Sequence, residues 1–504
     1  MPIETELKLR IAPSNLARLR RHPLLRAHRA APPLTRRLHN IYYDTPGLDL
    51  HKSGMALRLR RAGRQWLQTL KGGGSAQAGL HRRSEWEMPV SRAALDFSQP
   101  GAAEWAEYLP QAMRGRLQPL FVTDFSRTIW LLEWQGAQVE LCMDRGEVRA
   151  GEHSAPICEL ELELKSGEPR QLFALALALL DIVPLEPEAV SKAERGYRLL
   201  SGHDEGPVKA APLCLEKTAT LAQALQALIW SCLAHWQDNL RGAMESEDAE
   251  YLHQLRVALR RLRVALRMAM SYAADEHLSD LNKEIAAMCV GLGHARDWDV
   301  FIAQTLQPMC ARMPAHAGLQ TLLQAAQRQR DMQRAALRGE TQARAAQRLM
   351  LRLAAWMNGP YWQSFAGEEP ARRFATRRLR KLARRIVAFS GAPDAAGAAQ
   401  LHALRILAKK LRYSAEFFAS LYGSHKVAAY LAALAKMQAT LGQINDVAVA
   451  YRLLDGLVDE SALSVHQEAI ALAKGWIAHD LSRQFAALRK VRQHFDEQPA
   501  FWGK

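Results

Sequence analysis

The chain begins with a strict alternation of charged and other residues, Glu4-Thr5-Glu6-Leu7-Lys8. A longer run of the same kind, in which every second residue is leucine, spans Glu159 to Lys165. Successive side chains of a β-strand point to opposite faces, so the carboxylates of each run share one face. With the leucines packed outward, these strands would line a small barrel with carboxylates. Buried carboxylates are costly unless a divalent metal or cationic side chains compensate them.

Similar alternation predicts about eight strands in residues 1–200, with turn residues such as Thr45-Pro46-Gly47 between them. The predicted strands lie near 3–11, 38–43, 55–61, 65–71, 81–90, 124–133, 137–143 and 157–165. Helical stretches are expected near 13–21, 102–115 and 169–182. This pattern predicts an eight-stranded antiparallel β-barrel, or tunnel, with flanking helices.

Beyond the barrel the sequence becomes almost entirely helical, rich in Ala, Leu, Arg and Gln. The predicted fold class is therefore an α+β multidomain protein in which the barrel precedes an all-α helical bundle. The predicted boundaries are a barrel domain at 1–200, a linker at 201–217 and a helical domain at 218–495. A break at 390–399 (SGAPDAAGAA) divides the helical domain into halves of about 218–389 and 397–495.

The helical half contains an internal duplication. The pattern from His253 to Arg263 recurs from His402 to Arg412, and Gly293-x3-Asp297 recurs with the same offset of 149 residues as Gly442-x3-Asp446. One register thus relates the two copies, which predicts two pseudo-symmetric bundles. Asp297 and Asp446 are predicted to cap helix N-termini.

Composition indicates an anionic partner. The 504 residues carry a net charge of +16, with +5 in residues 1–200 and +11 in the remainder, and the pI is about 9.7. Such a charge favours nucleic acid, polyphosphate or a membrane surface. The six cysteines form no C-x-x-C pair, and the longest apolar run, 172–180, is too short for a membrane span. We therefore expect a cytoplasmic protein, with association to polyphosphate granules as a further prediction.

The predicted tunnel face carries both acids and bases. Clustered carboxylates hold Mg²⁺ or Mn²⁺, while Arg and Lys neutralise phosphate oxygens. A short linear polyphosphate needs both. The alternative is an open sheet whose charged face is solvated and carries only ion pairs.

Several motifs resemble the CYTH superfamily, the triphosphate tunnel metalloenzymes, over nearly all of residues 1–200. They are Glu4-x-Glu6-x-Lys8, Tyr42 to Pro46, Leu57 to Arg60, Thr69 to Lys71, Thr123 to Arg127, Glu140 to Gly146, Glu159 to Lys165 and Ser191 to Tyr197. The resemblance implies a tunnel that hydrolyses or cyclises triphosphates with Mg²⁺ or Mn²⁺. It implies metal ligands at Glu4, Glu6, Glu161 and Glu163. It implies triphosphate-binding cations at Lys8, Arg58, Arg60, Lys71, Arg127 and Lys192, with Lys8 also in a catalytic role. It implies catalytic or supporting acids at Glu85, Glu140 and Asp144.

In the helical half, basic residues form one stripe of a helix opposite leucines, once in each copy. A solvated face is the simpler interpretation, but these stripes contain no acid, and rows of guanidinium groups suit a phosphate chain. The doubled pattern over about 218–495 resembles a CHAD domain, which implies polyphosphate binding. The residues in question are His253, Arg256, Arg260, Arg263, His402, Arg405, Lys409 and Arg412.

The two resemblances together predict a metal-dependent inorganic triphosphatase that converts tripolyphosphate to pyrophosphate and phosphate, with a helical module that binds long-chain polyphosphate. This pairing is similar to bacterial inorganic triphosphatases. The alternatives are a nucleoside or thiamine triphosphatase, an adenylate cyclase on the same tunnel, or a non-catalytic polyphosphate-binding protein. No nucleic-acid motif is present.

Overall fold

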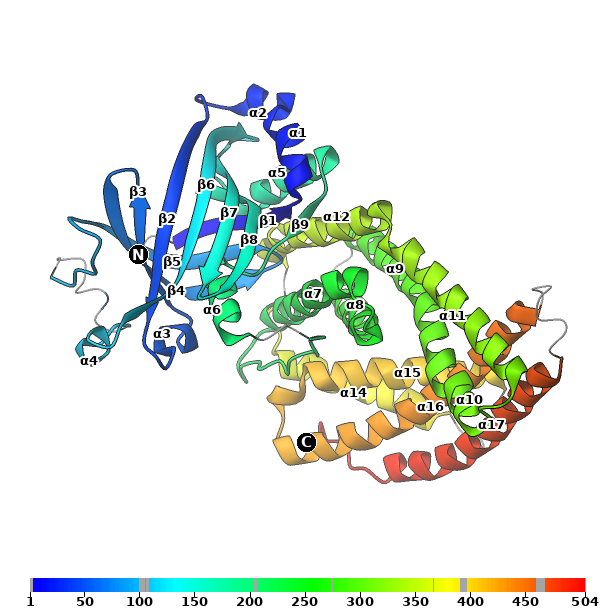
Figure 1. Cartoon of the computed structure of the whole chain (residues 1–504). Coiled ribbons are helices and arrows are strands. Elements are labelled where there is room, and N and C mark those ends of the chain that lie inside the picture. Colours follow the sequence, from blue (N-terminus) through cyan, green and yellow to red (C-terminus); the bar gives the residue numbers. More distant parts are fainter. Residues whose placement is uncertain are drawn as a thin grey trace. The chain divides into compact units, whose positions relative to one another are not determined.

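The computed structural model describes residues 3–98, 105, 108–202, 206–272, 275–365, 367–389, 397–458 and 467–503. The chain divides into two compact units. One comprises Met1–Gly206 with Arg344–Gln363, and the other comprises Pro207–Ala343 with Ser364–Lys504. The strands all belong to the first unit (Figure 1). None of the helices in these ranges combines the length and apolar character that crossing a membrane requires.

Eight antiparallel strands of the first unit close into the predicted barrel. Their order is β5-β4-β3-β2-β6-β7-β8-β1, and β1 pairs again with β5. The strands are β1 (Ile3–Ile11), β2 (Leu34–Asp44), β3 (Ala56–Ala62), β4 (Gln65–Gln77), β5 (Leu80–Val90), β6 (Gln118–Trp134), β7 (Ala137–Ala150) and β8 (His153–Ser166). A short strand that the sequence did not predict, β9 (Leu185–Pro187), pairs with the end of β1.

The leucines of the alternating runs face away from the barrel interior. Leu7 and Leu9 on β1 and Leu160 and Leu162 on β8 are fully buried, and helix α5 (Pro169–Ile182) packs against both strands. Each buried leucine stabilises the fold by roughly 1.5–3 kcal/mol. The charged residues between the leucines are thereby turned into the barrel, as the alternation predicted.

The other helices of the barrel are short. They are η1 (Pro13–Asn15), α1 (Leu16–Arg20), α2 (Pro23–His28), α3 (Asp49–Lys52), α4 (Gln111–Arg114) and α6 (Lys192–Ser201). Of the helix predicted near 102–115, the structure describes α4, whereas 101–104 and 106–107 lie outside the described residues. Helix α6 packs against β6, β7 and β8. A β-carbon at Gly196 of α6 would lie 2.1 Å from the ring of Phe121, so only glycine permits this close approach.

The rest of the chain is helical, as predicted. The helices are α7 (Leu221–Glu245), α8 (Ala249–Met270), α9 (Glu276–Phe301), the π-helical turn η3 (Ile302–Leu306), α10 (Gln307–Arg312), α11 (Ala317–Arg338), α12 (Glu340–Met357), α13 (Tyr361–Ser364), α14 (Ala371–Val387), α15 (Ala398–Phe417), η5 (Ala419–Leu421), α16 (Ser424–Val458) and α17 (Gln467–Asp496). Residues 203–205 of the predicted linker and 390–396 of the predicted break lie outside the described residues.

The sequence duplication appears as two corresponding helix pairs, α8 with α9 and α15 with α16. The basic patterns lie on α8 and α15, and the glycine-aspartate segments lie on α9 and α16. The N-cap prediction for Asp297 and Asp446 is wrong, because both residues lie inside long helices. A glycine inside a helix costs only about 1 kcal/mol relative to alanine, and the apolar residues around it keep the helix continuous through packing.

Candidate functional site

A cavity of about 260 Å³ lies inside the barrel. Seven carboxylates line it: Glu4, Glu6, Glu85, Glu87, Glu140, Glu161 and Glu163. Eight cationic side chains line it: Lys8, Arg58, Arg60, Lys71, Arg83, Arg127, Lys165 and Lys192. The negative and positive charges of the lining nearly balance. An anionic ligand that binds these cations must therefore displace the carboxylates that contact them.

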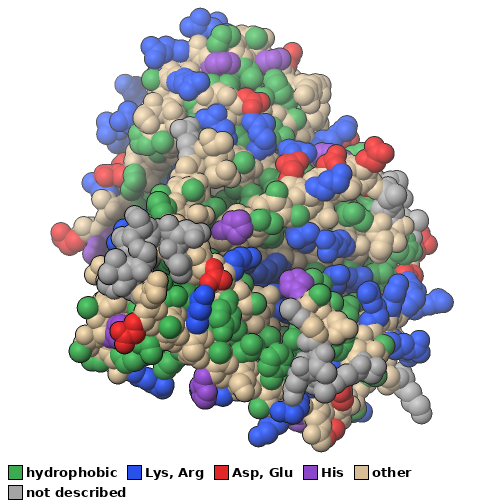
Figure 2. All heavy atoms as spheres, turned by 90° about the vertical axis from the view of Figure 1, so that its right-hand side faces the viewer, with side chains coloured by type: hydrophobic (Ala, Val, Ile, Leu, Met, Phe, Trp, Pro, Cys, Tyr) green, Lys and Arg blue, Asp and Glu red, His purple; other side chains and the backbone are tan. Residues whose placement is uncertain are grey.

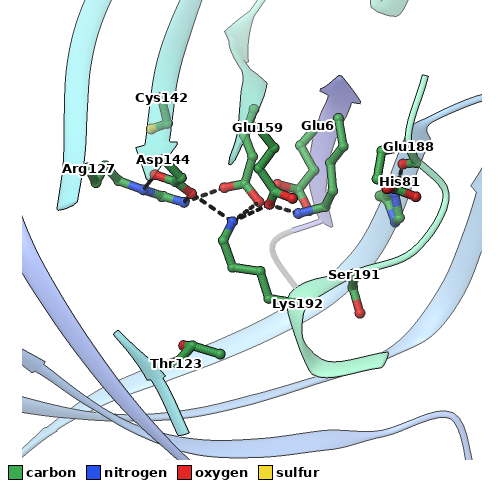
Figure 3. A network of polar contacts seen from close by, with 12 residues as sticks. Glu6, His81, Thr123, Arg127, Cys142, Asp144, Glu159, Glu188, Ser191 and Lys192 are labelled. Atoms are coloured by element: carbon green, nitrogen blue, oxygen red, sulfur yellow. Dashed lines mark hydrogen bonds and ion pairs between the residues drawn. The ribbon is translucent and has the colours of Figure 1, made fainter. Parts of the chain in front are cut away.

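The first group of ion pairs centres on Lys192 of α6 (Figure 3). Its Nζ lies 2.6 Å from a carboxylate oxygen of Asp144 and 2.9 Å from one of Glu161, and it also pairs with Glu159. Ser191 caps α6 by accepting a hydrogen bond of 3.1 Å from the backbone N–H of Glu194. This cap fixes the start of the helix, and Lys192 follows it directly.

Lys8 of β1 joins the same group. Its Nζ lies 2.9 Å from Glu6 and donates a hydrogen bond to Glu161. Burial lowers the pKa of Lys8, but the charges of Glu161 and Glu6 outweigh burial and raise that pKa above its ordinary value. Lys8 is therefore held charged at the cavity wall.

Arg127 binds Asp144 through two hydrogen bonds, of 2.8 Å from Nε and 2.7 Å from Nη2. Burial raises the pKa of Asp144, yet Arg127 and Lys192 together hold that pKa below its ordinary value. The Asp144 side chain is fully buried and does not line the cavity. The structure thus places this predicted catalytic acid behind the wall, where it anchors two cations.

A second group of ion pairs joins β1, β3, β4 and β5. Nζ of Lys71 lies 2.6 Å from Glu4 and 3.1 Å from Glu85, and Nη2 of Arg58 lies 3.4 Å from Glu85. Burial raises the pKa of Glu85, but Lys71 and Arg58 reverse this and hold the pKa below its ordinary value. Glu85 is therefore ionised and paired with two cations, Lys71 and Arg58.

Arg60 stands apart from these pairs. Its Nε donates a hydrogen bond of 2.9 Å to Oδ1 of Asn40, and no carboxylate of the described residues lies within ion-pair distance. Burial and the neighbouring charges of Arg58 and Arg127 lower the pKa of Arg60 to about 10. In addition, Nε of Arg58 is buried without a hydrogen-bond partner in the described structure. Buried guanidinium groups with unused donors favour an anionic ligand.

One group of candidate ligands for a divalent cation surrounds Glu163, which pairs in register with Glu6 of β1 and with Glu140 of β7. Burial raises the pKa of Glu163, and although Lys165 at 2.6 Å opposes this, the charges of Glu4 and Glu140 add to the increase. Crowded carboxylates whose ionisation is disfavoured match the oxygen ligands that Mg²⁺ and Mn²⁺ prefer. A divalent cation would relieve their repulsion.

A second acidic cluster fits a metal less well. Oxygens of Asp144, Glu159 and Glu161 lie within 4.8 Å of one another. However, Lys192 contacts all three residues, Arg127 binds two of them and Arg195 binds Glu159. Protein cations therefore already neutralise this cluster.

In the helical unit, the two basic stripes lie on α8 and α15, which pack against each other, and their residues are half-buried except for His402, which is exposed. Burial and the charge of Arg260 on α8 lower the pKa of Lys409 on α15 to about 6. Burial lowers the pKa of Arg405 on α15, Asp446 opposes this, and Arg260 contributes to the decrease. Charges of the two repeats thus act on one another, and α8 packs against α15.

Parts of the stripes lack partners. Nη1 of Arg256 donates 3.3 Å to the carbonyl of Cys289, and Nη1 of Arg405 donates 3.1 Å to Oδ1 of Asn445. Nε of Arg263 and Nε of Arg405 are buried without a partner in the described structure. Burial and Arg296 lower the pKa of His253, so this histidine adds no positive charge at neutral pH. The guanidinium groups rather than His253 therefore supply the charge of the stripes.

Comparison with known protein families follows the same division of the chain. A family model for the CYTH domain matches residues 2–197, and one for the CHAD domain matches residues 227–455. The chain combines a CYTH domain with a CHAD domain. The barrel is the CYTH domain, and the basic stripes lie in the CHAD domain.

One curated relative is an inorganic triphosphatase of Haemophilus influenzae, which is 39% identical over 168 residues. That match covers 32% of this chain and 46% of the relative, so the chain spans about half the length of the curated relative it matches. Among solved structures, the CHAD domain of the plant Ricinus communis is 33% identical with a TM-score of 0.51, covering 59% of this chain and 99% of that one. An adenylyl cyclase candidate from Hippeastrum with a dominant triphosphatase activity is 21% identical with a TM-score of 0.32, covering 40% of this chain and 96% of that one.

The barrel brings all the predicted tunnel residues except Asp144 to one cavity. The prediction missed several members of the site: Tyr42, Arg83, Glu87, Cys142, Lys165 and Ser191 as lining residues, and Arg195 as a partner of Glu159. Strand parity alone would have found Arg83 and Glu87, which share a face with Glu85. Arg195 lies on α6, the helix that also carries the predicted cation Lys192, but the sequence did not indicate that Arg195 pairs with Glu159.

Proposed function

We propose that the protein is a metal-dependent inorganic triphosphatase that hydrolyses tripolyphosphate to pyrophosphate and phosphate. The observation that carries the proposal is the state of two guanidinium groups that line the cavity: Nε of the buried Arg58 has no hydrogen-bond partner in the described structure, and Arg60 contacts the amide of Asn40 and forms no ion pair with a described carboxylate. The inorganic triphosphatase of Haemophilus influenzae supports the same activity.

The lining of the cavity supports an unsubstituted triphosphate. Ligand sites for drug-sized molecules typically enclose about 300–1,000 Å³, and this cavity encloses about 260 Å³. Tyr42 is the one aromatic residue among the lining side chains of the described structure. Its hydroxyl interacts with Arg58, and this contact, together with the charge of Arg60, lowers the pKa of Tyr42 despite burial. The cavity therefore offers no apolar wall for a nucleoside base or a thiazole ring.

In the proposed reaction, a water molecule attacks a terminal phosphorus, and the bond from that phosphorus to the bridging oxygen breaks to release pyrophosphate. Lys8, Arg58, Arg60, Arg127 and Lys192 bind the phosphate oxygens and stabilise the charge that moves onto the leaving pyrophosphate. A divalent cation, Mg²⁺ or Mn²⁺, would supply further charge neutralisation when bound. Its proposed ligands are Glu4, Glu6 and Glu163, joined by Glu161 once triphosphate has replaced that carboxylate at Lys8 and Arg127.

Glu140 is the proposed acceptor of the proton from the attacking water. It lines the cavity, and its contacts are weak: Sγ of Cys142 donates at 3.4 Å and Nζ of Lys165 lies 3.8 Å away. By contrast, Glu85 and Asp144 are each held by two cations. A carboxylate with uncommitted oxygens is the better base.

The CHAD domain is proposed to bind long-chain polyphosphate through the stripes of His253, Arg256, Arg260 and Arg263 and of His402, Arg405, Lys409 and Arg412. The unused guanidinium donors of Arg263 and Arg405, and the influence of Arg260 on the pKa of Lys409 across the two repeats, support this role. Binding a long chain close to the enzyme would raise the local concentration of phosphate substrates. Association with polyphosphate granules stays a prediction.

The test is a comparison of kcat/KM for tripolyphosphate, ATP and thiamine triphosphate with Mg²⁺ and with Mn²⁺, using the full chain. We expect a preference for tripolyphosphate of about 100-fold or more, because substituents on the terminal phosphate find no apolar wall. Equal or better turnover of ATP or thiamine triphosphate would instead identify a nucleoside or thiamine triphosphatase. Formation of cyclic AMP from ATP would identify a cyclase.

A further inference from the structure

The outer surface of the barrel near its first helices is strongly basic. Between Glu6 and Asp44 the sequence contains no acid, but it contains nine lysines and arginines. Seven of them are exposed and form no ion pair with any described acid: Arg18, Arg20, Arg21, Arg26, Arg29, Arg36 and Arg37. Figure 2 shows Lys and Arg side chains gathered at the upper end of the visible face, the end where Figure 1 places α1 and α2. Unpaired like charges repel one another, so this surface favours an anion.

Four of these arginines surround a groove of about 480 Å³. Arg20, Arg21, Arg26 and Arg29, contributed by α1, α2 and the residues around them, stand above a floor that includes Trp130 of β6. Trp130 is only 3% exposed. We call this feature the arginine groove.

The arginine groove lies behind the wall of the tunnel. Trp130 and Arg127 belong to the same strand, but their positions place them on opposite faces, so one lines the groove and the other lines the tunnel cavity. Arg29 forms a β-bridge with Leu132 of that strand. The exposed Arg36 pairs in register with Arg127 and shares a strand face with Tyr42 of the cavity. Arginines therefore occur on both faces of this part of the barrel wall, those of the groove outside and Arg36 and Arg127 inside.

We infer that the arginine groove binds inorganic polyphosphate chains that are too long for the tunnel cavity. The choice of ligand class rests on the proposed function. Four guanidinium groups around one groove bind successive phosphates of a chain through paired N–H donors. The groove is a separate feature from the stripes of the CHAD domain and belongs to the barrel alone.

The surroundings of the groove favour a phosphate chain over other polyanions. No Phe, Tyr or Trp occurs between residues 7 and 41, and Trp130 is buried, so the groove offers none of these rings for stacking the bases of a single-stranded nucleic acid. Helices α1 and α2 have five and six residues, too short to read a duplex groove. Leu34 is the one large apolar side chain that the described part of this surface exposes, which is too little for insertion into a membrane.

The experiment measures binding of the full chain to immobilised long-chain polyphosphate, with EDTA present to prevent hydrolysis. The test variant combines Arg20→Glu, Arg26→Glu and Arg29→Glu. The matched control combines Arg61→Glu, Arg64→Glu and Arg92→Glu, which makes the same charge change at exposed arginines away from the groove. Both are also made in a chain with Arg256→Glu and Arg405→Glu, so that the CHAD domain does not mask the effect. Thermal unfolding checks that each variant is folded.

The inference predicts that the test variant binds about tenfold more weakly than the control and that its slope of log affinity against log salt falls by roughly two. Equal binding by the two variants would overturn the inference. A larger loss for single-stranded RNA than for polyphosphate would also overturn it and would identify a nucleic-acid surface. Because EDTA prevents turnover, this result is independent of whether the tunnel hydrolyses tripolyphosphate.

Discussion

Nε of Arg60 donates a hydrogen bond of 2.9 Å to Oδ1 of Asn40 inside the CYTH barrel. An amide oxygen orients the guanidinium group without neutralising it. The neighbouring cations Arg58 and Lys71 are instead paired with Glu85. Arg60 is therefore a cation of the cavity that remains available to a phosphate group.

Asn40→Asp would convert this hydrogen bond into an ion pair and neutralise Arg60. We expect kcat/KM for tripolyphosphate to fall at least tenfold, equivalent to about 1.4 kcal/mol, because phosphate must then compete with a carboxylate. Steady-state kinetics at saturating Mg²⁺ measure this. Asn40→Ser is the control, because it shortens the side chain without adding charge. Equal activity of the aspartate and serine variants would exclude a direct role for Arg60.

Glu163 provides a test of the metal site. Its pKa is raised in the folded barrel, so ionisation of this carboxyl destabilises the fold at neutral pH, and this cost disappears as the pH falls through the raised pKa. We expect Mg²⁺ to raise the melting temperature at neutral pH and to lose this effect on acidification. Glu163→Gln should remove most of the response to Mg²⁺ while leaving the melting temperature without metal unchanged or up to roughly 2–4 °C higher.

The matched control for this metal titration is Glu147→Gln, which changes a half-buried carboxylate of the same barrel that does not line the cavity. Its response to Mg²⁺ should equal that of the unmodified chain. A Glu163→Gln variant with the full response would place the metal elsewhere.

Lys192→Ala tests the buried ion-pair group. The change leaves Asp144 and Glu159, both fully buried, with fewer cations. Removing one partner of a buried ion pair costs about 3–5 kcal/mol, and we expect a loss of this size in the free energy of unfolding at neutral pH. Asp144 then has a higher pKa in the folded variant, so part of the loss should be recovered as the pH is lowered. Chemical denaturation at several pH values measures this, with the exposed Lys52→Ala as control.

Lys409 makes the proposed polyphosphate binding pH-dependent. Burial, Arg260 and Arg405 lower its pKa to about 6, so the free CHAD domain holds this amine largely neutral at pH 8. A bound polyanion favours the charged amine, so binding takes up a proton and the affinity should fall as pH rises from 6 to 8, by up to tenfold per pH unit. The first repeat has Arg260 at the equivalent position. Lys409→Arg should therefore flatten the pH profile, and an unchanged profile would contradict this role.

The two repeats also supply a matched pair of glycines. A β-carbon at Gly293 would lie 2.8 Å from Nη1 of Arg256, whereas one at Gly442 would meet open space. Both substitutions by alanine favour the helix by up to about 1 kcal/mol. We expect only Gly293→Ala to weaken polyphosphate binding, because it displaces the guanidinium group. Equal affinities of the two variants for polyphosphate would show that Arg256 does not take part in binding.

Strand periodicity was sufficient to predict the barrel and which side chains enter it. Glu4, Glu6 and Lys8 alternate with buried leucines, and a period of two leaves no other arrangement once one face packs against α5. The sequence failed where contacts depend on tertiary packing. How closely α6 approaches the barrel decides which side chains Lys192 and Arg195 contact. This close approach is possible because Gly196 lies against Phe121. Asp297 was wrongly predicted to lie at the start of a helix. Local propensity does not reveal that packing keeps α9 continuous through Gly293.

The most direct test of the central claim is the release of products from tripolyphosphate by the purified full chain, followed by phosphorus NMR with Mg²⁺ and again after addition of EDTA. The proposed function predicts equal amounts of phosphate and pyrophosphate, formed only with the metal and reduced about 100-fold in an Arg60→Gln variant. An intact substrate in the presence of either Mg²⁺ or Mn²⁺, together with tight binding of tripolyphosphate, would contradict the claim and leave the tunnel as a binding site.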